Sequence, residues 1–93
     1  MQFEWDLGKE TENLRKHRVS FAEAVESFYD PEGFLLVDEK HSTTEERFYW
    51  VGKTLSDRVL TTRFTRRGAR IRIIRSAEWR AFRRLYDEKA KNE

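Results

Sequence analysis

The order of hydrophobic and polar residues along the chain predicts several short strands and three helices. Near the start, Phe3 and Trp5 alternate with polar residues, which favours a short edge strand. Later runs that are apolar, alternating or rich in β-branched residues predict strands over residues 34–37, 48–52, 59–65 and 70–75. Turn-forming residues separate the last three runs, so we expect these runs to pair as an antiparallel meander.

Three segments have the spacing or the end signals of helices. Residues 9–17 are polar and free of proline, and we expect a helix there. Ser20 and Glu23 form a capping box at the start of a second helix, which Asp30-Pro31 ends. A third helix is expected over residues 77–89, with Ser76 as its cap. This order of elements predicts one α+β domain over residues 1–93, with about four antiparallel strands. We place the helices on one face of the sheet and expect its other face to be open.

The last predicted strand carries arginines at alternate positions. Alternation with a period of two places Arg70 and Arg72 on one face, while Ile71 and Ile73 enter the core. Two guanidinium groups about 6–7 Å apart can straddle one phosphate or two adjoining phosphates. The same pattern also fits the solvent-exposed face of an ordinary strand.

The charge of the chain is strongly asymmetric, although its net charge is only +2. Residues 1–57 carry 7 Lys or Arg against 13 Asp or Glu, and residues 58–93 carry 12 against 4. The two halves therefore have net charges of −6 and +8, and 10 of the 12 basic residues in the second half are arginines. A one-sided arginine field indicates a polyanionic partner, most often nucleic acid.

The residue types and motifs that are missing exclude several classes of protein. The sequence has no cysteine, which excludes disulfides, thiolate metal sites and cysteine nucleophiles. It also has no glycine-rich phosphate loop, no paired-histidine metal spacing and no Gly-x-Ser-x-Gly motif. No apolar run approaches the roughly 20 residues of a membrane span, and the acidic N-terminus does not read as a secretory signal. We expect a cytoplasmic protein that uses no metal and no cofactor.

The remaining chemistry fits metal-free cleavage of RNA. RNA supplies its own nucleophile, the 2′-hydroxyl group, so the protein needs only to position the chain, move protons and stabilise charge. Arginines can stabilise the charge that develops on the phosphate oxygens, and a histidine or glutamate can act as general base. A nucleic-acid-binding module would need the arginines but no acid–base group.

Residues along nearly the whole chain match, in order, the sequence pattern of a known family. They begin with Phe3-Glu4-Trp5-Asp6, Lys9, Asn13, Lys16-His17, Val19-Ser20-Phe21 and Ala24. They continue with Phe28, Asp30-Pro31, Asp38, His41, Glu45-Glu46-Arg47-Phe48, Gly52, Arg67-Gly68, the strand from Arg70 to Ile74, and Tyr86. In these residues the chain resembles the BrnT family of type II toxins.

The resemblance implies a RelE-like fold and a ribonuclease that arrests translation when it is unopposed. It also implies a BrnA-type antitoxin as partner, and operator DNA is expected to be bound only through that antitoxin. Toxin and antitoxin of this family repress their own operon as a complex. We expect a hetero-oligomer in which an antitoxin dimer holds a toxin dimer.

For an enzyme of this kind, Arg70 and Arg72 are expected to bind and stabilise the scissile phosphate. Glu46 or His17 would be the acid–base group, and the sequence leaves the choice between them open. Further contacts with RNA are expected from Arg67, Lys53, Arg47 and Arg66.

A second hypothesis comes from positions that depart from the family pattern. Family members often have a Thr-Glu-Arg-Gly run before the last strand, where this chain has Thr65-Arg66-Arg67-Gly68. An acidic position has therefore become basic. The alternative is a catalytically inactive toxin homologue that binds its antitoxin and nucleic acid.

Overall fold

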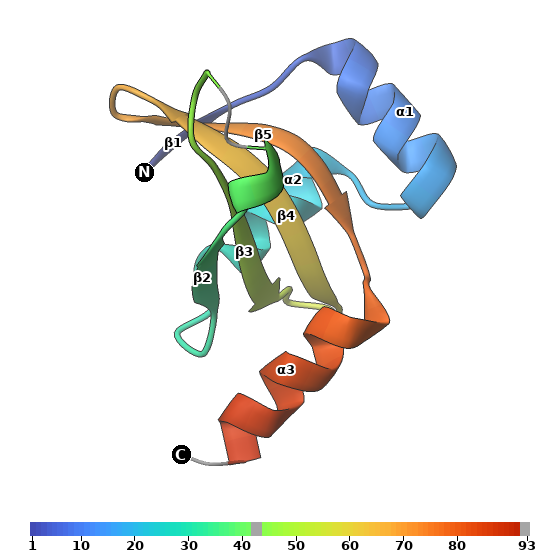
Figure 1. Ribbon diagram of the computed structural model, residues 1–93. Coiled ribbons are helices and arrows are strands. Elements are labelled where there is room, and N and C mark those ends of the chain that lie inside the picture. The colour runs from blue at the N-terminus through green and yellow to red at the C-terminus, as the bar shows by residue number, and fades with distance from the viewer. Residues whose placement is uncertain (42–43, 92–93) are drawn as a thin grey trace.

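A five-stranded sheet forms the centre of the molecule, with its strands in the order β1-β5-β4-β3-β2 (Figure 1). The structure, a computed structural model, describes residues 1–41 and 44–91. Its strands are β1 (Gln2–Glu4), β2 (Phe34–Val37), β3 (Arg47–Lys53), β4 (Val59–Arg67) and β5 (Arg70–Ala77). Strands β2 to β5 form the expected antiparallel meander, and β1 adds a fifth strand, parallel to β5. The predicted α+β class is confirmed.

Three α-helices accompany the sheet: α1 (Leu7–His17), α2 (Phe21–Ser27) and α3 (Arg80–Lys91). Helix α1 starts earlier than expected because the Asp6 carboxylate caps it, accepting a hydrogen bond from the Lys9 backbone N–H at 3.0 Å. Ser20 caps α2, as the capping box predicted. A short 3₁₀ helix, η1 (Glu39–His41), lies in the predicted polar loop over residues 38–44, of which residues 42–43 are outside the described part.

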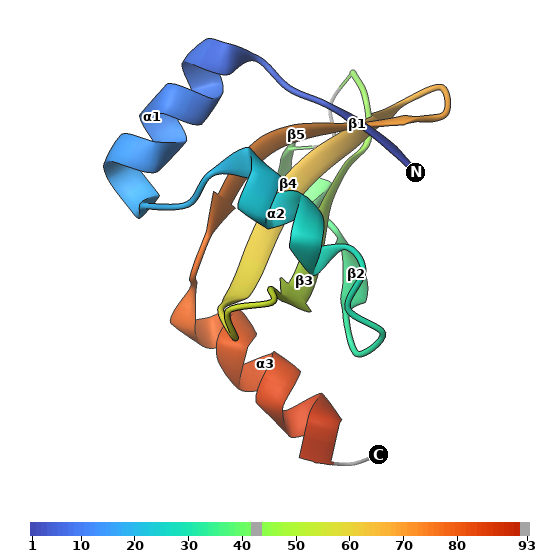
Figure 2. The same ribbon diagram turned by 180° about the vertical axis from the view of Figure 1, so that it is seen from behind.

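Different helices cover the two faces of the sheet. On one face, Leu60 and Ile73 pack against α2 and the segment before it, and Figure 2 shows α2 in front of the sheet. On the other face, Val51 and Val59 pack against Tyr86 of α3. The prediction that all helices share one face is therefore wrong for α3. Alternation along β3 and β4 sends Val51 and Val59 away from α2, and α3 shields these side chains from water.

Helix α1 lies beside the part of β5 that β1 leaves unpaired. Strand β1 pairs only with residues 70–72 of β5. Farther along, the buried Asn13 side chain of α1 donates hydrogen bonds of 2.8 Å to the carbonyl oxygens of Val19 and Ser76. It also accepts one of 3.0 Å from the Ser76 backbone N–H. This amide takes the place of a neighbouring strand and fixes α1 against the sheet.

The end of β5 differs from the prediction. The strand continues to Ala77 and α3 begins at Arg80, so the expectation that Ser76 caps the helix is wrong. Ser76 is fully buried, and its hydroxyl lies 2.9 Å from the hydroxyl of Thr62. The two hydroxyls satisfy each other inside the core, where an unpaired one would be costly.

Candidate active site: a basic groove between α1 and the sheet

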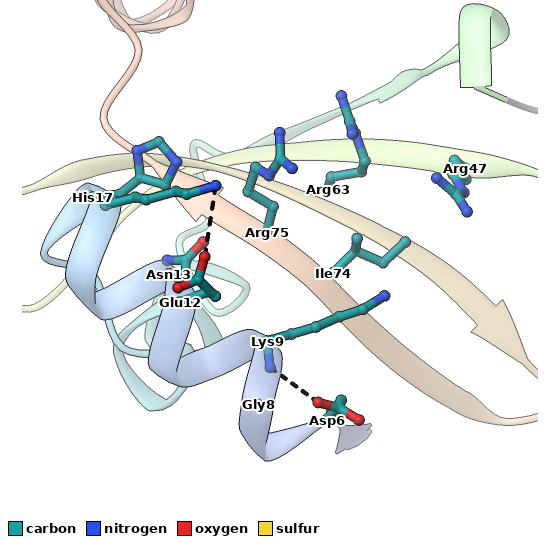
Figure 3. Close-up of a pocket in the computed structure, with 11 residues that line it drawn as sticks. Asp6, Gly8, Lys9, Glu12, Asn13, His17, Arg47, Arg63, Ile74 and Arg75 are labelled. Carbon is teal, nitrogen blue, oxygen red and sulfur yellow. Dashed lines mark hydrogen bonds and ion pairs between the residues drawn. The ribbon is translucent and has the colours of Figure 1, made fainter.

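A groove of about 510 Å³ lies between α1 and strands β3 to β5 (Figure 3). We call it the basic groove, because five lysines and arginines line it against two acidic residues. The complete lining is Asp6, Gly8, Lys9, Glu12, Asn13, Lys16, His17, Arg47, Arg63, Ile74 and Arg75. A concave site with this excess of positive charge attracts anions.

One face of α1 forms one wall of the groove. Five of its residues follow the spacing i, i+3, i+4, i+7 and i+8, which brings them to the same side of a helix: Lys9, Glu12, Asn13, Lys16 and His17. The Asn13 hydrogen bonds hold this face toward β5. The position of His17 relative to the sheet therefore depends on a buried amide one turn earlier.

A β-bulge turns Arg75 toward the groove. Arg63 of β4 pairs with Arg75, whereas Phe64 pairs with Ile73, so Ile74 is an extra residue in β5. Without this irregularity, alternation would put Arg75 on the same face as Ile73. Because cross-strand partners share a face, Arg75 instead lies beside Arg63 (Figure 3).

Asp38 and Tyr49 hold the Arg63 side chain in place. Its Nε lies 3.1 Å from Asp38 Oδ2, and the two side chains are only 11% and 5% exposed. Its Nη2 donates a hydrogen bond of 3.0 Å to the Tyr49 hydroxyl, and the guanidinium lies 5.4 Å from the centre of the Tyr49 ring. These contacts fix Arg63 in one orientation at the wall of the groove.

His17 combines partial burial with positive neighbours. Burial lowers the pKa of its imidazole, and the positive charges of Arg75 and Lys16 lower it further. A pKa below the ordinary value of 6.5 leaves the imidazole neutral at pH 7. A neutral imidazole can accept a proton, which makes His17 a candidate general base.

The predicted pair Arg70 and Arg72 projects from the same face and holds one carboxylate between them. Glu4 of β1 places one oxygen 2.7 Å from Arg72 Nη1 and the other 3.4 Å from Arg70 Nη1. The hydrogen bond from Arg72 holds the pKa of Glu4 below its ordinary value, so this carboxylate is charged at neutral pH. Arg70 and Arg72 therefore lie on one face of β5, as expected. Ile73 is buried and Ile71 packs against the core, so the two isoleucines face the core as expected.

Strand register extends the positive charge beyond the groove. Arg47 pairs with Thr65, which pairs with Arg72, and Arg67 pairs with Arg70. Together with the pair in the groove, these positions form an arginine face on β3 to β5: Arg47, Arg63, Arg67, Arg70, Arg72 and Arg75. Arg67 also lies 3.9 Å from Glu45.

Other predicted site residues lie away from the basic groove. Glu46 and Arg66 line a separate groove of about 260 Å³ together with Phe48 and Thr65. Lys53 is at the opposite end of β3 from Arg47, with its ammonium 5.6 Å from the centre of the Tyr86 ring. The structure thus brings His17 together with Arg47 in one groove. The other predicted site residues do not line it: Arg70, Arg72, Arg67, Glu46, Arg66 and Lys53.

Four basic residues of the groove were not predicted: Lys9, Lys16, Arg63 and Arg75. The helical spacing of Lys9, Lys16 and His17 was a usable signal for the first two. Arg63 and Arg75 gave no such signal, because their common face depends on a bulge that strict alternation does not predict.

The groove can hold a phosphate and move a proton next to it. It joins several guanidinium groups, of which that of Arg63 is held in place, to an imidazole that is neutral at pH 7. Within residues 1–41 and 44–91, no group of three or more His, Cys, Asp or Glu side chains is arranged to hold a metal ion.

None of the helices in these ranges is long and apolar enough to cross a membrane.

The chain is similar to known proteins in both sequence and structure. A family model described as "Ribonuclease toxin, BrnT, of type II toxin-antitoxin system" matches residues 5–81. The structure is similar to the 1.1 Å crystal structure of the Brucella abortus ribonuclease toxin BrnT, with a TM-score of 0.65 and 17% sequence identity. That similarity covers 85% of this chain and 96% of the other. No curated protein sequence matches the chain.

Proposed function

The chain belongs to the family of BrnT ribonuclease toxins of type II toxin–antitoxin systems, and we propose that it cleaves RNA in the basic groove without a metal ion. One observation carries the proposal: His17, with its lowered pKa, shares a groove with Arg63 and Arg75. A ribonuclease that uses the 2′-hydroxyl of its substrate needs a base and fixed positive charge at the same phosphate, and this groove offers both.

The reaction uses groups that the groove already holds. His17 accepts the proton of the 2′-hydroxyl, whose oxygen bonds to phosphorus while the bond to the 5′-oxygen breaks. The products are a 2′,3′-cyclic phosphate and a 5′-hydroxyl end, which takes its proton from solvent. Arg75 and Arg63 stabilise the negative charge that grows on the non-bridging oxygens.

The remaining arginines of the arginine face bind phosphates next to the cleaved one. Arg70 and Arg72 hold the Glu4 carboxylate through separate oxygens, and a phosphate offers oxygens at a similar spacing. Glu46 is the alternative acid–base group, and it would act from the separate groove that it lines with Arg66. The position of His17 beside the arginines favours the histidine.

The antitoxin partner completes the proposed role. Membership of a type II family implies a cognate antitoxin. We propose that it is of the BrnA type, that it blocks the arginine face, and that the complex represses its own operon through DNA contacts of the antitoxin. Free toxin would cleave RNA in the cytoplasm and arrest translation.

Induction in a bacterial host tests this function. The chain alone should stop growth and fragment RNA, whereas co-expression with the reading frame adjacent to its gene should prevent both. His17→Gln and Arg75→Ala should remove toxicity, while Arg83→Ala, on the exposed side of α3, should keep it. If Glu46→Gln is harmless and His17→Gln remains toxic, Glu46 is the acid–base group. A wild-type chain that is harmless would show an inactive homologue.

A further inference from the structure

The sheet face that carries α2 has a second groove, which the proposed cleavage does not use. Helix α2 is only seven residues long, so part of this face has no helix over it (Figure 2). A groove of about 310 Å³ opens there, lined mostly by apolar and aromatic side chains that include Phe48, Trp50 and Phe64. We call it the aromatic groove.

The apolar surface continues outward to the edge of the sheet. Cross-strand register places Val37, Phe48, Phe64 and Ile73 in one row from β2 to β5. The inner end of this row is buried, but Val37 at its outer end is 51% exposed. Leu35, which lines the groove, is 54% exposed. Large apolar side chains exposed side by side indicate a surface that another molecule covers.

The backbone of β2 offers a second kind of contact. In the described part of the chain, β2 is the last strand of the sheet and pairs only with β3. Its four residues, Phe34 to Val37, are all apolar. Proteins usually protect such an edge with lysine, proline or a bulge, and β2 has none of these within its span. An extended peptide segment can pair with this edge and place alternate side chains toward the groove.

Charge at the rim indicates the character of the partner. Arg66 is exposed beside the apolar lining, and none of the described residues that line the groove is acidic. A second copy of this chain would bring the same arginine and would be repelled. A carboxylate in a partner segment would instead pair with it.

We propose that the aromatic groove and the outer edge of β2 bind an extended segment of the cognate antitoxin that carries large apolar side chains flanked by acidic residues. This inference rests on the family membership that implies an antitoxin, and the segment binds on the face opposite His17. This contact adds affinity away from the cleavage groups, while the rest of the antitoxin blocks the arginine face.

Binding of the purified antitoxin, encoded by the adjacent reading frame, tests the proposal by calorimetry. Leu35→Asp should weaken binding about 100-fold, because it places a charge against an apolar partner. Arg66→Glu should weaken binding about 10-fold, with a smaller effect at high salt. The matched control is Leu55→Asp, which changes a leucine that is 90% exposed in the turn between β3 and β4 and should bind normally.

Three results would overturn the proposal. Leu35→Asp could bind the antitoxin as tightly as the wild type does. Light scattering could show a wild-type dimer that Leu35→Asp dissociates, which would make the surface an interface between copies of this chain. Leu35→Asp could lose affinity for an RNA oligonucleotide, which would make the groove an RNA site. RNA cleavage by the free Leu35→Asp protein is measured in parallel, so that a failure of the proposed ribonuclease activity is distinguished from a failure of this docking site.

Discussion

Removal of the Asn13 side chain should loosen α1 from the sheet and disable the basic groove. Asn13 is 4% exposed and makes three hydrogen bonds, two to carbonyl oxygens and one from the Ser76 backbone N–H. Each such bond contributes about 0.5–1.5 kcal/mol, and buried groups left without partners add a further penalty. Asn13→Ala should therefore lower the free energy of unfolding by about 3 kcal/mol or more.

Thermal and urea unfolding measure this loss. At about 4–8 °C per kcal/mol for a domain of this size, the melting temperature should fall by roughly 12–24 °C. Thr11→Ala is the control on the same helix, because the exposed Thr11 hydroxyl donates a hydrogen bond to the Leu7 carbonyl oxygen one turn before it. We expect this control to change stability by less than about 1 kcal/mol.

The rate of RNA cleavage should also depend on the Asn13 hydrogen bonds. The Asn13→Ala protein should cleave RNA more slowly than the wild type even at temperatures well below its melting temperature. The reason is that Asn13 joins α1, which carries His17, to β5, which carries Arg75. An Asn13→Ala protein that unfolds within about 1 kcal/mol of the wild type would refute the reasoning.

Three further predictions concern charge and packing. The His17 imidazole should titrate below pH 6.5 by NMR in a variant without the second histidine. Arg75→Ala should raise that pKa, because it removes a positive neighbour. Acidification should destabilise the fold, because the unfolded chain binds the His17 proton more tightly than the folded chain does. Asp38→Asn should cost about 3–5 kcal/mol in urea unfolding by leaving Arg63 buried without its carboxylate, and adding Arg63→Met should recover part of the loss. Gly52→Ala should lower the melting temperature, because a Cβ there would collide with the carbonyl oxygen of the last residue of α2.

Much of the fold could be predicted from local patterns. The Ser20 cap, the end of α2 before Asp30-Pro31 and the two hairpins each depend on neighbours in sequence, and the structure has all of them. The end of β5 could not be predicted this way. Ser76 before an amphipathic segment reads as a cap, but its partners are Asn13 and Thr62, which are 63 and 14 residues away.

The site was harder to predict because it depends on tertiary structure. Alternation correctly placed Arg70 and Arg72 on one face, yet it could not show that Glu4 lies between them. The bulge at Ile74 brings Arg75 to Arg63, and no residue in β5 signals it. His17 was a candidate by residue type, and only the fold of α1 against β5 gave it arginine neighbours.

The central claim is that the basic groove cleaves RNA through an imidazole beside fixed guanidinium groups. Its most direct test is cleavage of a defined RNA by purified protein in excess chelator, with the ends of the products identified. We expect 2′,3′-cyclic phosphate ends, a loss of about 10²–10³ in rate for Arg75→Ala, a loss of about 10²–10⁴ for His17→Gln, and a wild-type rate for Arg83→Ala. Cleavage that needs added metal, or that survives both groove substitutions, would contradict the account.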